Sequence, residues 1–171
     1  MTDTDITAMQ GTREYLTLTS LNYNTKQGAT NLIGSKLVTA IINNDRAEAW
    51  YEIRYNSNKS KEAGIAKRRF MEADTFGLYD DGIELAANSM NDENAKGAFR
   101  VATRHGMQSM KDYEASLRLS NGTLAIDAAI SELAMTVYKL DDLLAPAKQY
   151  LIDHYVTTPT LGISITGVCW N

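Results

Sequence analysis

Cysteine and proline are scarce in this chain of 171 residues, which contains one cysteine and two prolines. The single cysteine, Cys169, excludes an internal disulfide and a cysteine-based zinc cage. With only 11 glycines, the composition is not that of a collagen-like or disordered chain. No apolar run approaches the ~18 residues of a membrane-spanning helix, so we expect no membrane insertion.

A secretion signal is also lacking at the start of the sequence. Residues 1–5 are acidic and contain no apolar stretch of the kind that directs export. We therefore expect no signal peptide and a protein that is cytoplasmic as synthesised. Delivery to the periplasm or the cell wall would depend on other machinery.

Charge is modest and close to balanced, because 17 lysines and arginines face 21 acidic residues and leave a net charge of -4. Such a chain is not a general binder of nucleic acid or of anionic membranes. A basic cluster does occur between residues 59 and 69, but Glu62 and Glu72 interrupt and flank it. This pattern favours a solvated helical face. Hydrophobic residues make up 44% of the chain, enough for a core.

Apolar residues recur at steps of three and four along most of the chain, which predicts an all-α fold. The threonines of the first segment would suit a strand almost as well, and the last segment alternates like a short strand or is irregular. We expect a helical region over 1–80, a further helical segment over 81–157 and a tail over 158–171. The expected helices are 12–24, 35–42, 45–55, 64–79, 93–119, 123–140 and 141–156.

Two of these helices begin with capping residues. Ser35 can cap the short helix that carries Leu37 and Ile41. Asp45 is followed three residues later by Glu48, which is close to the capping-box pattern and suits the positive end of a helix dipole. The sequence therefore predicts helix starts at both positions.

The most specific stretch is 64–76, where a glycine and an aliphatic residue precede two arginines, a glutamate and a later apolar residue. This pattern resembles the closing helix of phage-type lysozymes, the muramidases related to T-even phage lysozyme and to the bacteriocin pesticin. Segments 21–24, 35–43 and 45–56 resemble three earlier landmarks of that family, in the same order. The resemblance covers roughly 12–80 and implies the helical C-terminal lobe of such an enzyme, with these anchors: Gly64, Ile65, Arg68, Arg69, Glu72 and Phe76.

The catalytic pattern of that family is missing. A muramidase needs a carboxylic acid and a second carboxylate or a positioned water. In the family these groups lie in an N-terminal lobe, as a glutamate followed nine residues later by an aspartate and six further on by a threonine. Two acidic pairs here have the nine-residue offset, but alanine stands at the threonine position in both: Glu72, Asp81 and Ala87, and Glu132, Asp141 and Ala147. We assign no catalytic residue.

Three residues are candidates for binding a sugar. Tyr55 and Asn56 stand at a predicted helix end beside the polar loop 56–61, where they could offer a stacking face and an amide. Arg68 could contact a ligand from the arginine-rich helix. The alternative is structural, with a packed aromatic and a helix cap. Arg69 and Glu72 are three residues apart and are expected to form a structural ion pair.

No other chemistry is indicated. His105 and His154 are isolated, so we expect neither a metal site nor a cofactor. The leading hypothesis is a peptidoglycan-directed, muramidase-related protein that binds glycan and lacks the catalytic acid. Such a protein would be either a part of a longer enzyme or toxin, or a degenerate relative. The alternative is a non-catalytic helical interaction module that reuses the lobe as scaffold and presents 83–157 to a protein partner. The resemblance implies a missing N-terminal lobe as another partner. A third hypothesis places a rebuilt acid at Glu72 or Glu132.

Overall fold

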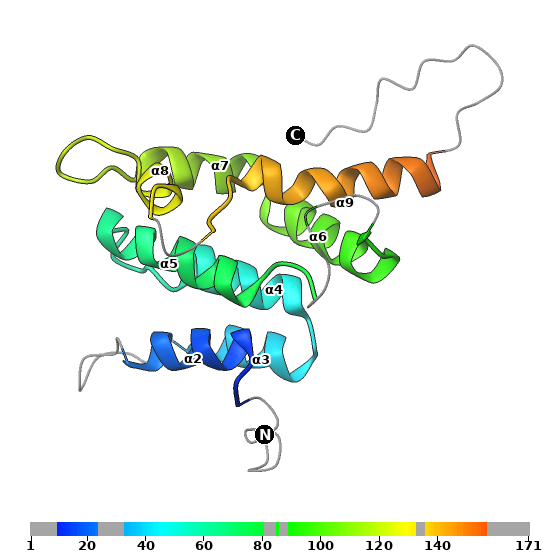
Figure 1. Cartoon of the computed structure of the whole chain (residues 1–171), viewed down its shortest axis with the longest axis horizontal. Coiled ribbons are helices and arrows are strands. Elements are labelled where there is room, and N and C mark those ends of the chain that lie inside the picture. Colours follow the sequence, from blue (N-terminus) through cyan, green and yellow to red (C-terminus); the bar gives the residue numbers. More distant parts are fainter. Residues whose placement is uncertain (1–9, 24–32, 81–84, 86–88, 133–135, 157–171) are drawn as a thin grey trace.

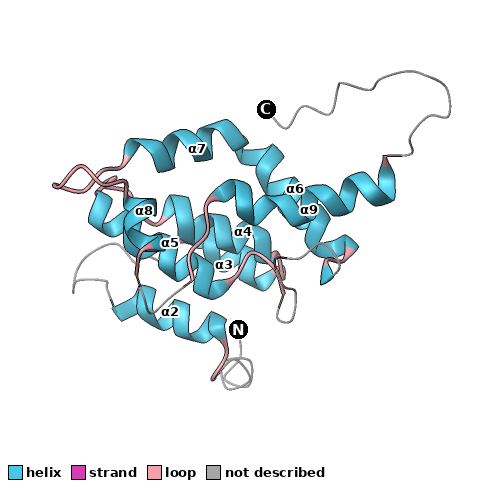
Figure 2. Ribbon diagram, turned by 45° about the horizontal axis from the view of Figure 1, so that its top comes forward, coloured by secondary structure: helices cyan, strands magenta, loops and turns pink. Residues whose placement is uncertain are grey.

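A computed structural model describes residues 10–23, 33–80, 85, 89–132 and 136–156. This part of the chain consists of helices joined by loops, so the predicted all-α class is confirmed (Figure 1, Figure 2). Its only β pairing is a single antiparallel bridge between Arg118 and Leu124. The predicted strand-like tail, 158–171, lies outside the described residues.

The first half agrees closely with the predicted helices. Asp45 caps its helix as predicted, since its carboxylate accepts from the Glu48 amide at 3.2 Å. The residue before the preceding helix is Gly34, so the predicted cap at Ser35 is wrong and Ser35 is the first helical residue. The elements are α2 (Arg13–Tyr23), α3 (Ser35–Ile42), α4 (Arg46–Tyr51), the π-helical turn η1 (Glu52–Asn56) and α5 (Ala63–Phe76).

The helices of the second half are shorter than the apolar periodicity predicted. The single helix predicted over 93–119 is wrong, because Gly106 adopts φ 78° and divides it. That left-handed conformation suits glycine and ends a right-handed helix. The helix predicted over 123–140 is also wrong, since it ends at Ile130. The elements are α6 (Asp92–His105), α7 (Met107–Ser116), α8 (Ala125–Ile130) and α9 (Leu140–Tyr155).

One hydrophobic core joins the regions before and after residue 80. Helix α5 packs between α2 and α8, and α6 packs along α9 (Figure 1). The Tyr79 hydroxyl donates to the Leu143 carbonyl at 2.5 Å, which ties the end of the first region to α9. Burying these apolar side chains provides the main stabilisation. The main core includes, among others, Leu21, Trp50, Ile53, Phe76, Val101, Met110, Leu140 and Leu144.

Candidate functional site

The three predicted sugar-binding residues lie on two separate surfaces. Tyr55 and Asn56 line a pocket of about 370 Å³ between η1, the loop that follows it and α7, here called the tyrosine pocket. Arg68 lines a different hollow of about 660 Å³, here called the α2–α5 groove. The tyrosine pocket is lined by Tyr51, Tyr55, Asn56, Asn58, Lys59, Lys61, Ser109, Met110 and Tyr113.

A buried ionic cluster lies next to the tyrosine pocket. The fully buried Arg54 guanidinium donates to Asp74 at 2.8 Å, to Glu114 at 3.0 and 3.1 Å, and to the Tyr138 carbonyl at 2.9 Å. Its carbon lies 4.8 Å from the centre of the Phe70 ring. Burial alone would lower the pKa of Arg54, but Asp74 and Glu114 hold that pKa above its ordinary value. The cluster therefore fixes η1 against α5 and α7 as a charged, fully bonded unit.

Tyr55 belongs partly to this cluster. Its hydroxyl donates to Glu114 Oε1 at 2.8 Å, and its residue is 7% exposed. Its ring meets Trp50 and Tyr113 edge to face, with centroids 5.9 and 5.5 Å away. Burial raises the pKa of Tyr55 well above its ordinary value. Tyr55 thus forms part of the pocket wall and supports it, with little surface left for stacking on a sugar.

The loop after η1 is organised by Asn58, which is buried. Its amide group donates to the Glu62 carbonyl at 3.0 Å and to the Tyr113 hydroxyl at 3.1 Å. Its carbonyl oxygen accepts from Ser60 Oγ and from the Glu62 amide, both at 3.3 Å. Lys61 takes the left-handed conformation, at φ 53°. These contacts define the loop that carries two lysines to the rim of the pocket.

Solvent-facing polar groups surround the mouth of the tyrosine pocket. Asn56 is exposed, and its amide donates to Glu52 at 2.8 Å, which leaves its carbonyl oxygen available. Ser109, Lys59 and Lys61 are exposed as well. Tyr51 is half-buried and stacks on His105, with ring centroids 3.5 Å apart and planes at 8°. The pocket therefore combines aromatic walls with an amide, a hydroxyl and two ammonium groups.

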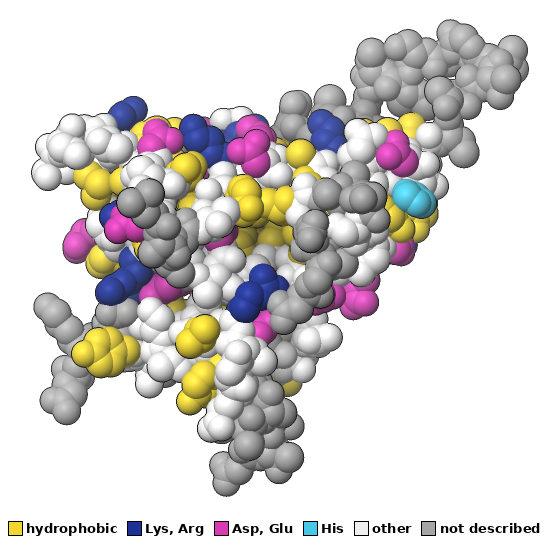
Figure 3. Space-filling view, in the orientation of Figure 1, with side chains coloured by type: hydrophobic (Ala, Val, Ile, Leu, Met, Phe, Trp, Pro, Cys, Tyr) yellow, Lys and Arg dark blue, Asp and Glu magenta, His cyan; other side chains and the backbone are white. Residues whose placement is uncertain are grey.

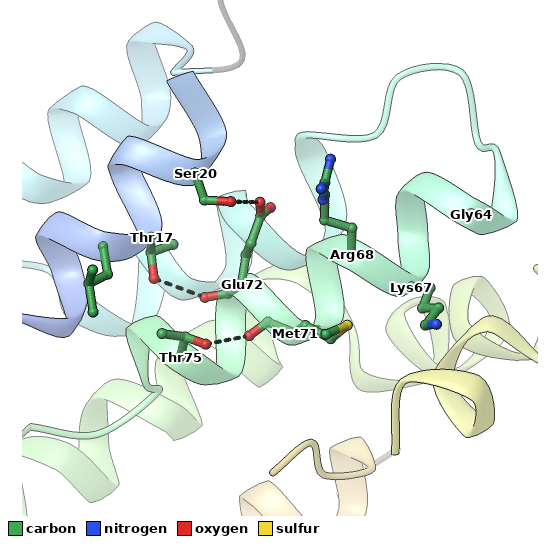
Figure 4. Close-up of a pocket in the computed structure, with 9 residues that line it drawn as sticks. Thr17, Ser20, Gly64, Lys67, Arg68, Met71, Glu72 and Thr75 are labelled. Carbon is green, nitrogen blue, oxygen red and sulfur yellow. Dashed lines mark hydrogen bonds between the residues drawn. The ribbon is translucent and has the colours of Figure 1, made fainter. Parts of the chain in front are cut away.

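The α2–α5 groove holds the arginine-rich helix and its glutamate (Figure 4). The buried Glu72 carboxylate accepts from Ser20 Oγ at 2.5 Å and forms an ion pair with Arg69. The Glu72 carbonyl accepts from Thr17 Oγ1 at 3.2 Å. Oε1 and the carbonyl of Glu72 therefore join α2 to α5, while Oε2 pairs with Arg69 within α5. This arrangement does not favour the rebuilt acid at Glu72, because a general acid must present its proton to substrate.

The two basic residues of the groove point in different directions. Figure 4 shows Arg68 directed away from Lys67 on α5. The Lys67 ammonium pairs with Glu132 at 2.6 Å, so the other candidate for a rebuilt acid is held in a surface ion pair. Arg68 is exposed at the edge of the groove. The groove does not bring Arg68 together with Tyr55 or Asn56, since the two pockets share no lining residue.

Sequence reasoning missed the ionic cluster and the part that α7 plays in the pocket. Arg54 lies in the segment 45–56, which resembles part of the lysozyme family. This resemblance was the sequence signal that pointed to the residue. Nothing in the sequence pairs it with Glu114, because the two are 60 residues apart. The Nε2 atom of His105 lies 3.0 Å from Oε1 of Glu48. The described residues contain no group of three or more potential metal ligands.

None of the described helices has the length and hydrophobicity needed to cross a bilayer. Comparison with known proteins adds no relative from which a function could be transferred. No protein-family model, no curated protein and no solved structure matches this chain.

Proposed function

We propose that this protein binds the glycan of peptidoglycan at the tyrosine pocket, as the glycan-binding lobe of a muramidase-related protein, and does not cleave it. The observation that carries the proposal is one pocket that combines tyrosine side chains in its walls with the exposed amide of Asn56 and the exposed hydroxyl of Ser109. Its volume of about 370 Å³ falls within the usual range of ligand sites, ~300–1,000 Å³. Aromatic walls beside a few polar groups suit a sugar, whose faces are apolar and whose edges carry hydroxyl and acetamido groups.

The distribution of carboxyl groups supports binding without hydrolysis. Glycoside cleavage needs an acid beside the glycosidic oxygen and a second carboxylate, ~5–9.5 Å away. None of the nine residues that line the tyrosine pocket is acidic. Glu114 lies nearby, but its Oε1 already accepts hydrogen bonds from Arg54 and Tyr55 inside the buried cluster.

Sedimentation with purified peptidoglycan sacculi tests the proposal. We expect the protein to sediment with the sacculi and the double variant Asn56→Ala/Ser109→Ala to remain largely in solution. The matched control is Gln149→Ala on α9, which lies outside the pocket lining and should sediment like wild type. Equal sedimentation of the double variant would remove the tyrosine pocket from the proposal. Clearing of a cell-wall suspension would overturn the non-catalytic assignment.

A second candidate function is the helical interaction module, and the exposed face of α2, rather than the partner surface predicted over 83–157, favours it. Leu16 and Tyr23 are 59% and 87% exposed and lie two helical turns apart, on one side of α2. Leu16 also lines the α2–α5 groove. Figure 3 shows exposed apolar side chains over the end of the molecule formed by α2 and α3. A protein partner, or the missing N-terminal lobe, would bury these side chains.

Light scattering distinguishes this second candidate. An interaction module that pairs with itself should give a dimer or larger assembly, and Leu16→Glu should return it to a monomer. A monomeric protein that sediments with sacculi supports glycan binding as the function of the chain alone.

A further inference from the structure

We infer that the tyrosine pocket selects a saccharide that bears a carboxylate, and that Lys59 and Lys61 bind this group. The inference rests on the proposed function and adds the class of ligand. It is carried by the charge of the pocket lining, which includes two lysines and no acidic residue. The chain as a whole carries a net charge of -4, whereas the residues that line this pocket carry a net positive charge.

Neither Lys59 nor Lys61 has a carboxylate partner among the residues that the structure describes, whereas Lys67, Lys96 and Lys111 each pair with one. The acidic residue closest in sequence is Glu62, which bonds to Asn58 through its backbone amide and carbonyl and does not line the pocket. Two other acidic groups near the pocket are engaged. Glu52 accepts from Asn56, and Glu114 accepts from Arg54.

The loop also fixes the backbone of the two lysines before a ligand arrives. The four side-chain hydrogen bonds of Asn58 close the loop onto Glu62, Ser60 and Tyr113. The Lys61 amide donates to the Asn58 carbonyl at 3.2 Å, which fixes the left-handed turn. A loop fixed in this way lowers the entropic cost of binding.

The carboxylate recognised there has two chemical sources in peptidoglycan. One is the lactyl group of N-acetylmuramic acid where no peptide is attached, and the other is the peptide stem. The first carboxylate lies on the amino sugar itself and the second on the peptide that the sugar carries, and a polymer of N-acetylglucosamine alone has neither. The walls would hold the sugar while the lysines at the rim pair with the acid.

Calorimetric titration with three probes tests the inference. The probes are the disaccharide of N-acetylglucosamine and N-acetylmuramic acid, its methyl ester, and a free stem peptide. We expect the acid to bind about fivefold more tightly than the ester, the ratio that corresponds to an exposed ion pair of ~1 kcal/mol. The preference should shrink as salt is raised. Lys59→Gln/Lys61→Gln should abolish it, and Lys36→Gln, at an exposed lysine on α3, should keep it.

The outcomes separate this inference from the function on which it rests. Equal binding of acid and ester overturns the inference and leaves glycan binding standing. A preference that survives in the double variant also overturns it, because the acid would then be recognised elsewhere. Binding of the stem peptide alone identifies the peptide as the source of the carboxylate. Failure of every probe to bind overturns both proposals.

Discussion

Arg54 and Glu114, which are 60 residues apart in the chain, meet in the interior, where Nε and Nη2 of the arginine donate to Oε1 of the glutamate at 3.1 and 3.0 Å. Asp74 takes a third guanidinium bond at 2.8 Å. The pair joins η1 to α7 and so forms the base on which the tyrosine pocket is built. Because Tyr55 bonds to the same Glu114 oxygen, the geometry of the pocket depends on this ionic cluster.

The first prediction concerns the removal of this arginine. Arg54→Met should lower the free energy of unfolding by about 3–5 kcal/mol, because it leaves buried Asp74 and Glu114 without their counter-charge. The control is Arg100→Met, which breaks an exposed ion pair with Asp45 and should cost less than ~1 kcal/mol. Urea denaturation measures both. Equal losses in the two variants would show that the buried cluster does not stabilise the fold.

A second prediction is a pH dependence that originates at Glu14. Burial alone would raise the pKa of the Glu14 carboxyl, but Arg46 donates a hydrogen bond to it and holds the pKa below its ordinary value of 4.5. A lowered folded-state pKa means that Glu14 stabilises the protein above pH 4.5, and that this stabilisation is lost as the pH falls through the folded pKa.

The comparison of wild type with Glu14→Gln measures this effect. We expect wild type to be more stable than the variant at pH 7 and the difference to decline as the pH falls below 4.5. Thermal unfolding at a series of pH values gives the difference directly. A difference that stays constant or grows toward acid pH would contradict the Arg46 pairing.

Two glycine substitutions should have opposite signs. Gly106→Ala should destabilise the protein by about 1–2 kcal/mol, because an L-residue is strained at φ 78°. Gly64→Ala should stabilise it by ~0.4–1 kcal/mol, since that glycine lies in α5 with nothing within 4 Å of the added Cβ. Melting temperatures report both. A stabilising Gly106→Ala would mean that α6 and α7 run as one helix in solution.

The helices themselves were largely predictable, but their interruptions were not. Apolar spacing located α3, α4 and α5 within a few residues, and the Asp45 cap was read correctly because the signal is local. Gly106 lies inside the single helix predicted over 93–119. Apolar periodicity continues across it and so gives no signal of the left-handed φ that ends α6 there.

The site was predictable only where its residues are close in the sequence. Tyr55 and Asn56 are adjacent, and the pocket contains both. Arg68 was grouped with them because it carries a matching motif, yet it lines a different surface. Tyr113 and Ser109 reach the pocket from α7, and no sequence pattern specifies how that helix docks against η1.

A further prediction concerns the loop that carries the two lysines. Asn58→Ala should remove four side-chain hydrogen bonds and lower the free energy of unfolding by about 1–3 kcal/mol, because it leaves buried groups without partners. Hydrogen exchange of the amides over 56–62 should become faster than exchange in α9. Unchanged protection of this loop would show that Asn58 does not organise it.

The central claim, that the tyrosine pocket binds the glycan, is tested most directly by NMR titration with the disaccharide of N-acetylglucosamine and N-acetylmuramic acid. The account predicts that the resonances that shift belong to Asn56, Lys59, Lys61, Ser109 and Tyr113, while those of the α2–α5 groove stay in place. Shifts confined to the groove around Ser20 and Arg68, or no shifts at saturating disaccharide, would contradict it.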